Sequence, residues 1–204
     1  MTFFYRFVRG AATLYAKLFY RVEFHGRENE PEEGPLLVIS NHSSFTDPVF
    51  TACALKRQIH FMAKSDLEKH GFLRFVFKHA GVYTVNRGES DLRAMRISTE
   101  SLAKGECIGI YPQGTRMPGV APSKEQSMAG IGLIAKKQKP AVLPVTICYG
   151  SNPKPIFGKK VHVYIGKPLN VGELLDNNPE LSSKEISEHL FSLVCNDFAE
   201  HNDG

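Results

Sequence analysis

Short apolar runs alternate with segments of helical periodicity along most of this 204-residue chain, and that alternation most constrains how it can fold. Residues 36–40, 107–111 and 141–147 are strand-length runs almost free of charged side chains, which is typical of strands buried on both faces. Because helical segments separate these runs, the sequence predicts a single α/β domain whose mixed, largely parallel β-sheet is flanked by helices.

Further strands are expected at 60–63, 81–85 and 161–166. Helices are expected at 48–57, at 65–79 with a break at Gly71, at 89–104 and at 128–137. A last helix begins after Ser182, because Ser182 and Glu185 form a capping box. In such sheets chemistry gathers in the loops that follow strands, so the loops after residues 40, 85 and 111 are the candidates for a functional site.

The first 22 residues carry the whole net charge of the chain. They contain four cations and no acid, and the formal net charge of the chain is +4. On a helix over residues 3–22, aromatic and aliphatic side chains share one broad face, and Arg6, Arg9, Thr13 and Lys17 lie opposite. This face either packs on the domain or lies in a membrane interface, with the cations at anionic head groups. The charge concentration favours the second alternative: an interfacial amphipathic helix over residues 1–22, followed by one domain over residues 23–204.

The rest of the chain excludes several classes of protein. Its charges balance, so no basic face of the fold predicts nucleic-acid binding. The four cysteines form no CxxC pair and are expected to be free thiols in a reducing compartment. No apolar run reaches the 18 residues that a transmembrane helix needs. The histidines and cysteines show no metal-ligand spacing, so no metal site is expected.

The loop after residue 40 contains a histidine and an aspartate five positions apart, His42 and Asp47. Their side chains meet only if the chain turns between them, since an extended chain would hold them about 16 Å apart. An imidazole oriented by a carboxylate is what a general base requires. The structural alternative is that Asp47 caps a helix beginning with Pro48, and that His42 is an ordinary loop residue. No GxSxG nucleophile motif accompanies the histidine, which indicates a substrate that brings its own hydroxyl.

Two other strand-end loops place an arginine close to a glycine. Arg87-Gly88 follows the strand at 81–85, and Gly114-Thr115-Arg116 follows the strand at 107–111. Guanidinium groups bind phosphate bidentately, and glycine lets backbone N–H groups approach closely. Either arginine alone is explained by an ordinary surface turn, but two such loops in one sheet favour a phosphate site.

Together these loops resemble the glycerolipid acyltransferase family, in particular the bacterial 1-acyl-sn-glycerol-3-phosphate acyltransferases. The likeness spans about residues 20–170 and follows the family's order. The matching blocks are NHxxxxD at 41–47, A-K-x-x-L at 63–67, V-x-R-G at 85–88, F-P-E-G-T-R at 111–116 and V-x-P-V at 142–145.

The resemblance implies transfer of an acyl chain from acyl-CoA or an acyl carrier protein to the sn-2 hydroxyl of 1-acyl-sn-glycerol 3-phosphate, which makes phosphatidic acid for phospholipid synthesis. It implies that His42 takes the hydroxyl proton and that Asp47 supports it, without an acyl-enzyme, a metal or a cofactor beyond the thioester co-substrate. It further implies that the phosphate is held by Arg87, Gly114, Thr115 and Arg116, with Lys64 as an additional candidate.

One departure from the family leaves the acceptor open. Residue 113 is Gln where the family usually has Glu, in a block that helps to hold glycerol phosphate. The alternatives are an acyltransferase for another acceptor, such as a lyso-amino-lipid or glycerol 3-phosphate, and a non-catalytic protein that binds lipid or acyl carrier. The expected location is the cytoplasmic face of the cell membrane, as a peripheral protein on an anionic surface.

Overall fold

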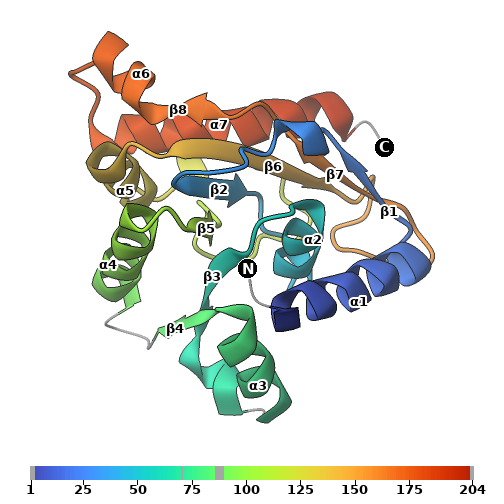
Figure 1. Ribbon diagram of the computed structural model, residues 1–204. Helices are drawn as coiled ribbons and strands as arrows, with labels where there is room; N and C mark the ends of the chain where they lie inside the picture. Colours follow the sequence, from blue (N-terminus) through green and yellow to red (C-terminus); the bar gives the residue numbers. More distant parts are fainter. Residues whose placement is uncertain (1–2, 70, 86–89, 203–204) are drawn as a thin grey trace.

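The computed structural model describes residues 3–69, 71–85 and 90–202. Within them lies an eight-stranded sheet in the order β1-β7-β6-β2-β5-β3-β4, with the short β8 also paired to β6 (Figure 1). The strands are β1 (Val22–His25), β2 (Leu36–Ser40), β3 (Ile59–Lys64), β4 (Tyr83–Val85), β5 (Cys107–Ile110), β6 (Ala141–Cys148), β7 (Val161–Ile165) and β8 (Leu169–Asn170). The helices are α1 (Phe3–Tyr20), α2 (Asp47–Ala54), α3 (Gly71–Ala80), α4 (Ser90–Ala103), α5 (Gly130–Gln138), α6 (Val171–Asn177) and α7 (Ser183–His201), with 3-10 turns η1 (Arg27–Asn29), η2 (Ser65–Lys69) and η3 (Lys124–Gln126).

The direction of the strands confirms the predicted fold class. Strands β6, β2, β5, β3 and β4 are parallel neighbours, whereas β7 runs antiparallel to β6 and is parallel to β1. The sheet is therefore mixed and largely parallel. The expected strands and helices are present, and the capping box at Ser182 is formed. Strands β1 and β8 and helix α6 were not expected, because each is too short to show a clear periodicity.

Helix α1 packs on the domain by a narrow face that holds Tyr5, Ala16 and Tyr20. Arg9 lies on the same side and donates to the carbonyl oxygens of Leu55 and Lys56, at 2.5 and 2.6 Å, just beyond α2. Arg9, one of the cations on the polar face predicted from the sequence, therefore binds the domain itself. The carbonyl oxygens at the end of a helix lack hydrogen-bond donors within the helix, and the guanidinium of Arg9 provides those donors.

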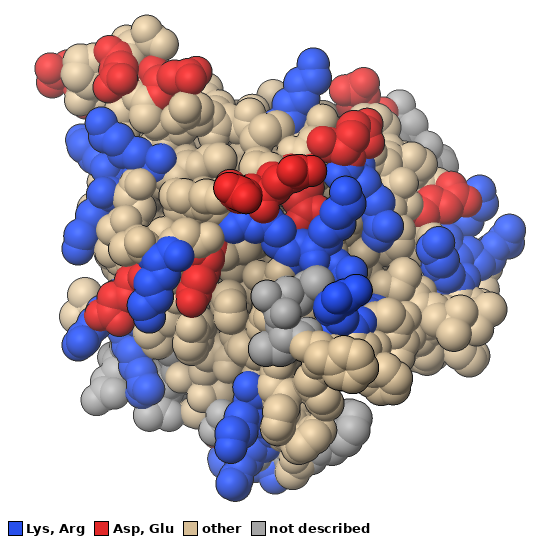
Figure 2. Space-filling model, viewed as in Figure 1, with Lys and Arg blue, Asp and Glu red and all other residues tan. Residues whose placement is uncertain are grey.

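The apolar stripe of α1 points outward. We define the α1 stripe as Phe3, Phe7, Leu14 and Leu18, which are 85, 68, 60 and 66 % exposed. In Figure 2, Lys and Arg side chains border a broad uncharged surface in the region of α1. Most of the predicted apolar face is thus not used for packing on the domain, although Phe4 of that face contacts Phe75 and His79 of α3. None of the helices described combines the length and apolarity that a membrane span requires.

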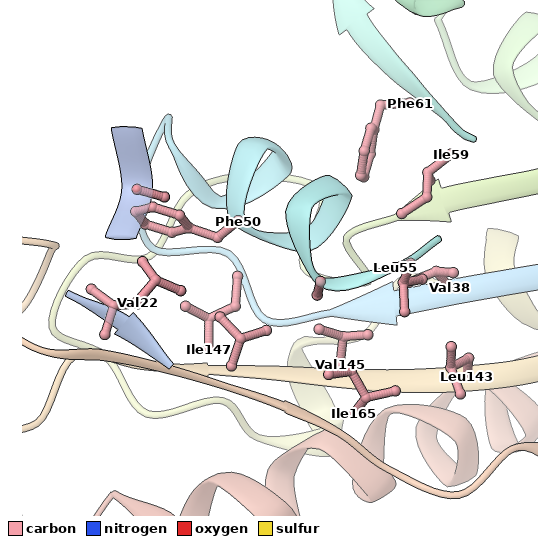
Figure 3. Packing of buried hydrophobic residues seen from close by; sticks show 14 of the residues in the cluster. Val22, Val38, Phe50, Leu55, Ile59, Phe61, Leu143, Val145, Ile147 and Ile165 are labelled. Carbon is pink, nitrogen blue, oxygen red and sulfur yellow. The ribbon is translucent and has the colours of Figure 1, made fainter. Parts of the chain in front are cut away.

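The boundary expected at residue 22 is not a break in the fold. Helix α1 ends at Tyr20, and buried Val22 already begins β1. Tyr20 stacks edge-on against Phe50 of α2, with ring centroids 5.4 Å apart. The N-terminal helix therefore shares one hydrophobic core with the rest of the domain, as the packing around Val22 and Phe50 in Figure 3 shows.

Strand β2 shows how the sheet is buried on both faces. Leu36 and Val38 face the core under α1 and α2, and Leu37 and Ile39 face the core under α5 and α7. All four are at most 1 % exposed. Fully burying such a side chain stabilises the fold by about 1.5–3 kcal/mol. The central strand is therefore rigidly placed, and so is the loop that follows it.

Candidate active site

Several strand ends meet at one edge of the sheet. Strands β2 and β5 are parallel neighbours with Ile39 opposite Ile110, so the loops that follow them leave the sheet side by side. Strands β3 and β4 end in the same direction, with Lys64 opposite Val85. The carboxyl edge of a parallel sheet is where ligand sites form. All of the loops singled out in the sequence begin at this edge.

His42 and Asp47 meet in the loop after β2. Nδ1 of His42 lies 2.8 Å from Oδ2 of Asp47, and the two side chains are 17 and 1 % exposed. A carboxylate accepts hydrogen bonds, so the proton of the neutral imidazole is on Nδ1. Nε2 then carries the lone pair that can accept a proton. The predicted pair thus has the geometry of an oriented general base.

The carboxylate of Asp47 organises the whole loop. Its Oδ2 also accepts the backbone N–H groups of Ser43 and Ser44, at 2.7 and 2.8 Å, and its Oδ1 accepts the hydroxyl of Tyr149. Asp47 is the first residue of α2, whose N-cap is Thr46. The structural alternative, in which Asp47 is the N-cap of the helix, is therefore wrong, because the Asp47 oxygens accept hydrogen bonds from the preceding loop and the histidine.

A buried tyrosine, Tyr149, and a half-buried one, Tyr111, complete the surroundings of the pair. Burial, together with the negative charge of Asp47, raises the pKa of Tyr149 well above its ordinary value, so Tyr149 remains a hydrogen-bond donor. Burial and Asp47 likewise raise the pKa of Tyr111. The Tyr111 ring stacks on the imidazole of His42, with centroids 4.1 Å apart and planes 20° apart. This contact restricts the orientation of the imidazole ring.

Asn41 fixes the start of the loop. Its side chain donates to the carbonyl oxygen of Ile147 at 2.9 Å and accepts the Ile147 N–H at 2.8 Å. These two bonds reproduce the pairing of adjacent strands one residue beyond the end of β2. His42 therefore follows a residue that is tied to both β2 and β6.

The loop after β5 docks on the backbone of His42. Oε1 of Gln113 accepts the His42 N–H at 2.7 Å, and the Met117 N–H donates to the His42 carbonyl oxygen at 2.8 Å. Arg116 immediately precedes Met117 and is exposed. Gly114 has a φ of +65°, and a Cβ there would collide with Met128. The loop thus requires glycine at 114 and holds Arg116, with exposed Thr115, near the histidine.

Gln113 supports the loops from inside the protein. Its side chain is 5 % exposed, and its Nε2 donates to Oε1 of Gln126 in η3 at 2.8 Å. The departure from the family at residue 113 therefore alters a buried connection between two loops. It does not change a group exposed to an acceptor.

The remaining predicted residues are only partly described. Arg87 lies outside the described residues. For Lys64 the structure describes only the backbone. Lys64 is the last residue of β3, at the carboxyl edge of the sheet. The residues that the sequence did not single out are Tyr111 and Tyr149, since an aromatic residue at the end of a buried strand most often signals packing.

We expect Asp47→Asn to lower kcat about 10²- to 10⁴-fold with a smaller change in the Michaelis constant for the acceptor. Asn keeps the size of the side chain but loses the charge that stabilises a protonated His42. If the role of residue 47 is purely structural, Asn accepts most of the same hydrogen bonds and activity stays near that of the parent. Steady-state kinetics beside a thermal melt separates the two outcomes.

Comparison with known proteins adds to this geometry. The sequence model of the family described as Acyltransferase matches residues 21–148. A 1-acyl-sn-glycerol-3-phosphate acyltransferase of Bacillus subtilis is 28 % identical over 183 residues, which are 89 % of this chain and 88 % of that protein. The chloroplastic 1-acyl-sn-glycerol-3-phosphate acyltransferase LPAT1 of Arabidopsis thaliana is 27 % identical over 165 residues, and the match covers 74 % of this chain but 44 % of that protein. The crystal structure of the 1-acyl-sn-glycerophosphate acyltransferase PlsC from Thermotoga maritima has the same fold, with a TM-score of 0.74 and 24 % identity, covering 98 % of this chain and 82 % of that one.

Proposed function

Because the chain belongs to the Acyltransferase family, we propose that it transfers an acyl chain from a thioester to the sn-2 hydroxyl of 1-acyl-sn-glycerol 3-phosphate and so makes phosphatidic acid. The observation that carries this proposal is the hydrogen-bonded pair of His42 and Asp47 at the carboxyl edge of the sheet. Relatives named for this reaction support the choice of acceptor.

In the proposed reaction, Nε2 of His42 takes the proton of the acceptor hydroxyl while the oxygen attacks the thioester carbonyl carbon. The ester C–O bond forms, the C–S bond breaks, and the proton passes from the imidazole to the departing thiolate. Asp47 holds the Nδ1–H and stabilises the transient imidazolium, and the stacked ring of Tyr111 restricts the orientation of the imidazole. The acceptor supplies the nucleophile, so no acyl-enzyme is formed.

The phosphate of the acceptor is proposed to bind beside the histidine. Arg116 supports this, because its loop is bonded to the His42 backbone and its side chain is free to reach solvent. Gly114 and Thr115 would contribute from the same loop, and Arg87 and Lys64 from the neighbouring strand ends. A charge-assisted hydrogen bond of this kind contributes about 1.5–3 kcal/mol.

We expect Arg116→Ala to raise the Michaelis constant for a phosphorylated acceptor about 10- to 150-fold, because one charge-assisted contact is lost. The constant for the acyl donor should change much less. Arg93→Ala, which removes an exposed arginine from α4, is the matched control and should leave both constants unchanged. A defect confined to the donor would instead assign Arg116 to the thioester substrate.

The acyl donor is proposed to be acyl-CoA or an acyl carrier protein, and the working surface to be the cytoplasmic face of the membrane. The outward α1 stripe supports a peripheral membrane site, with exposed Arg6 and Lys17 placed for anionic head groups. The apolar surface continues beyond α1, because Phe157, 62 % exposed, stacks on Tyr20 with centroids 4.8 Å apart.

A panel of acceptors with one fixed acyl thioester tests the proposed function, with thiol release and product mass as readouts. The expected result is transfer to 1-acyl-sn-glycerol 3-phosphate in preference to a lyso-amino-lipid or glycerol 3-phosphate. Preference for either of those acceptors would reassign the substrate. Absence of thiol release with every acceptor would favour a protein that only binds lipid or acyl carrier.

A further inference from the structure

Three potential metal ligands gather at the β1–β7 edge of the sheet. The parallel pairing puts Glu23 opposite His162, and His25 projects from the same face of β1 as Glu23. His162 pairs with Cys148, the last residue of β6, and His25 is level with Thr146 through Tyr164. The trio therefore lies near the carboxyl end of β6, on strands separated from β2 by β6. Figure 1 shows β1 and β7 near the C-terminal end of α7.

The distances among these ligands fit a small metal ion. Nε2 of His25 lies 3.2 Å from Nδ1 of His162, and that Nδ1 lies 3.5 Å from Oε2 of Glu23. One ligand atom from each residue lies within 4.8 Å of the others. Two atoms that each lie about 2.0–2.1 Å from Zn²⁺ at a tetrahedral angle are about 3.3 Å apart. Two of the three distances between ligand atoms are therefore already close to the spacing that a tetrahedral ion imposes.

We propose that Glu23, His25 and His162 bind one Zn²⁺ ion, with water in the fourth position. Two imidazoles and one carboxylate are a donor set that suits Zn²⁺. The Glu23 and His162 side chains are 41 and 29 % exposed, which leaves the ion a path from solvent. The two histidines are 137 residues apart in sequence, so no local spacing reveals the site.

Neighbouring residues hold the ligands in place. The Lys160 ammonium lies 2.7 Å from Oε1 of Glu23, so it engages the carboxylate through the oxygen that does not face His162. Tyr164 stacks on His25 with centroids 4.6 Å apart, and on His201 of α7 with centroids 3.9 Å apart.

The proposed ion would fasten the strand that follows α1. Among the described strands, β1 pairs only with β7, so its attachment to the sheet depends on that one ladder. If the ion binds the folded chain but not the unfolded one, it raises the ratio of folded to unfolded protein. At a free concentration 100 times the dissociation constant, that ratio rises about 100-fold.

The test uses the full chain, stripped of metal and titrated with ZnCl₂ in a calorimeter and with Co²⁺ in an absorption spectrometer. The expected result is one Zn²⁺ per chain, a visible Co²⁺ spectrum of tetrahedral intensity that Zn²⁺ displaces, and a higher melting temperature with Zn²⁺. The double variant His25→Gln/His162→Gln should lose at least 100-fold in affinity. His189→Gln, at an exposed histidine of α7, is the matched control and should bind as the parent does.

Two outcomes would overturn the proposal. One is the absence of stoichiometric Zn²⁺ binding by the parent protein, and this result does not depend on any variant. The other is unchanged binding after substitution of the ligands. If the double variant fails to fold, Glu23→Gln removes one ligand and keeps both histidines, and unchanged binding and an unchanged Co²⁺ spectrum in that variant would equally contradict the site.

Discussion

The His42→Ala variant is expected to lose about 10²- to 10⁴-fold in kcat, the usual contribution of a general base. The loss should appear in thiol release from the acyl donor at saturating acceptor. His189→Ala, at the exposed histidine of α7, should turn over at the parental rate. Near-normal turnover by a folded His42→Ala protein would refute the proposed mechanism.

The fold should survive this substitution. The contacts of His42 with the loop after β5 are made by its backbone, which donates to Gln113 and accepts from Met117. Alanine retains both bonds. Asp47 also keeps the N–H groups of Ser43 and Ser44 as partners. A thermal melt close to that of the parent would therefore show that the lost activity reflects the imidazole itself.

The central sheet and the pairing of His42 with Asp47 were both predictable from sequence, for related physical reasons. Every side chain of β2 before Ser40 is apolar, so both faces of this strand must be buried. A histidine and an aspartate that follow such a strand are held at the carboxyl edge. The turn between them needs only local hydrogen bonds, which Ser43 and Ser44 supply.

Contacts between distant segments were not predictable in this way. Tyr149 reaches Asp47 from the end of β6, and Gln113 reaches His42 from the loop after β5. The pairing of β1 with β7, which brings His25 to His162, joins segments that are more than a hundred residues apart. Periodicity within a segment carries no information about such partners.

Helix α1 shows the limit of periodicity most clearly. The pattern correctly predicts a helix with one apolar face, but it does not say which face meets the domain. The structure turns Tyr5, Ala16 and Tyr20 inward and exposes the α1 stripe. Small and aromatic side chains fit the narrow space against α2 and β1, and Arg9 satisfies the carbonyl groups beyond α2.

The double variant Leu14→Gln/Leu18→Gln is expected to weaken binding to anionic vesicles about 30- to 1,000-fold. Fully burying a leucine side chain contributes about 1.5–3 kcal/mol, and these two are 60 and 66 % exposed, so each has about 1–2 kcal/mol to gain from the membrane. The matched control is Leu92→Gln/Leu133→Gln on α4 and α5, where the leucines are 82 and 46 % exposed. That control should bind as the parent does.

Point substitutions test the membrane role more cleanly than removal of α1. Deleting the helix would also remove Tyr5, Ala16 and Tyr20 from the core, so a loss of binding would be mixed with a loss of stability.

Vesicle sedimentation at low and high salt adds a second criterion. Attraction between cations and head groups, about 1 kcal/mol each, is screened by salt, whereas apolar insertion is not. Parental binding should therefore weaken but persist at high salt, and activity of the Leu14/Leu18 variant should fall on bilayer-presented acceptor but not on a soluble short-chain one. Equal vesicle binding by this variant and its control would show that α1 does not contact the membrane.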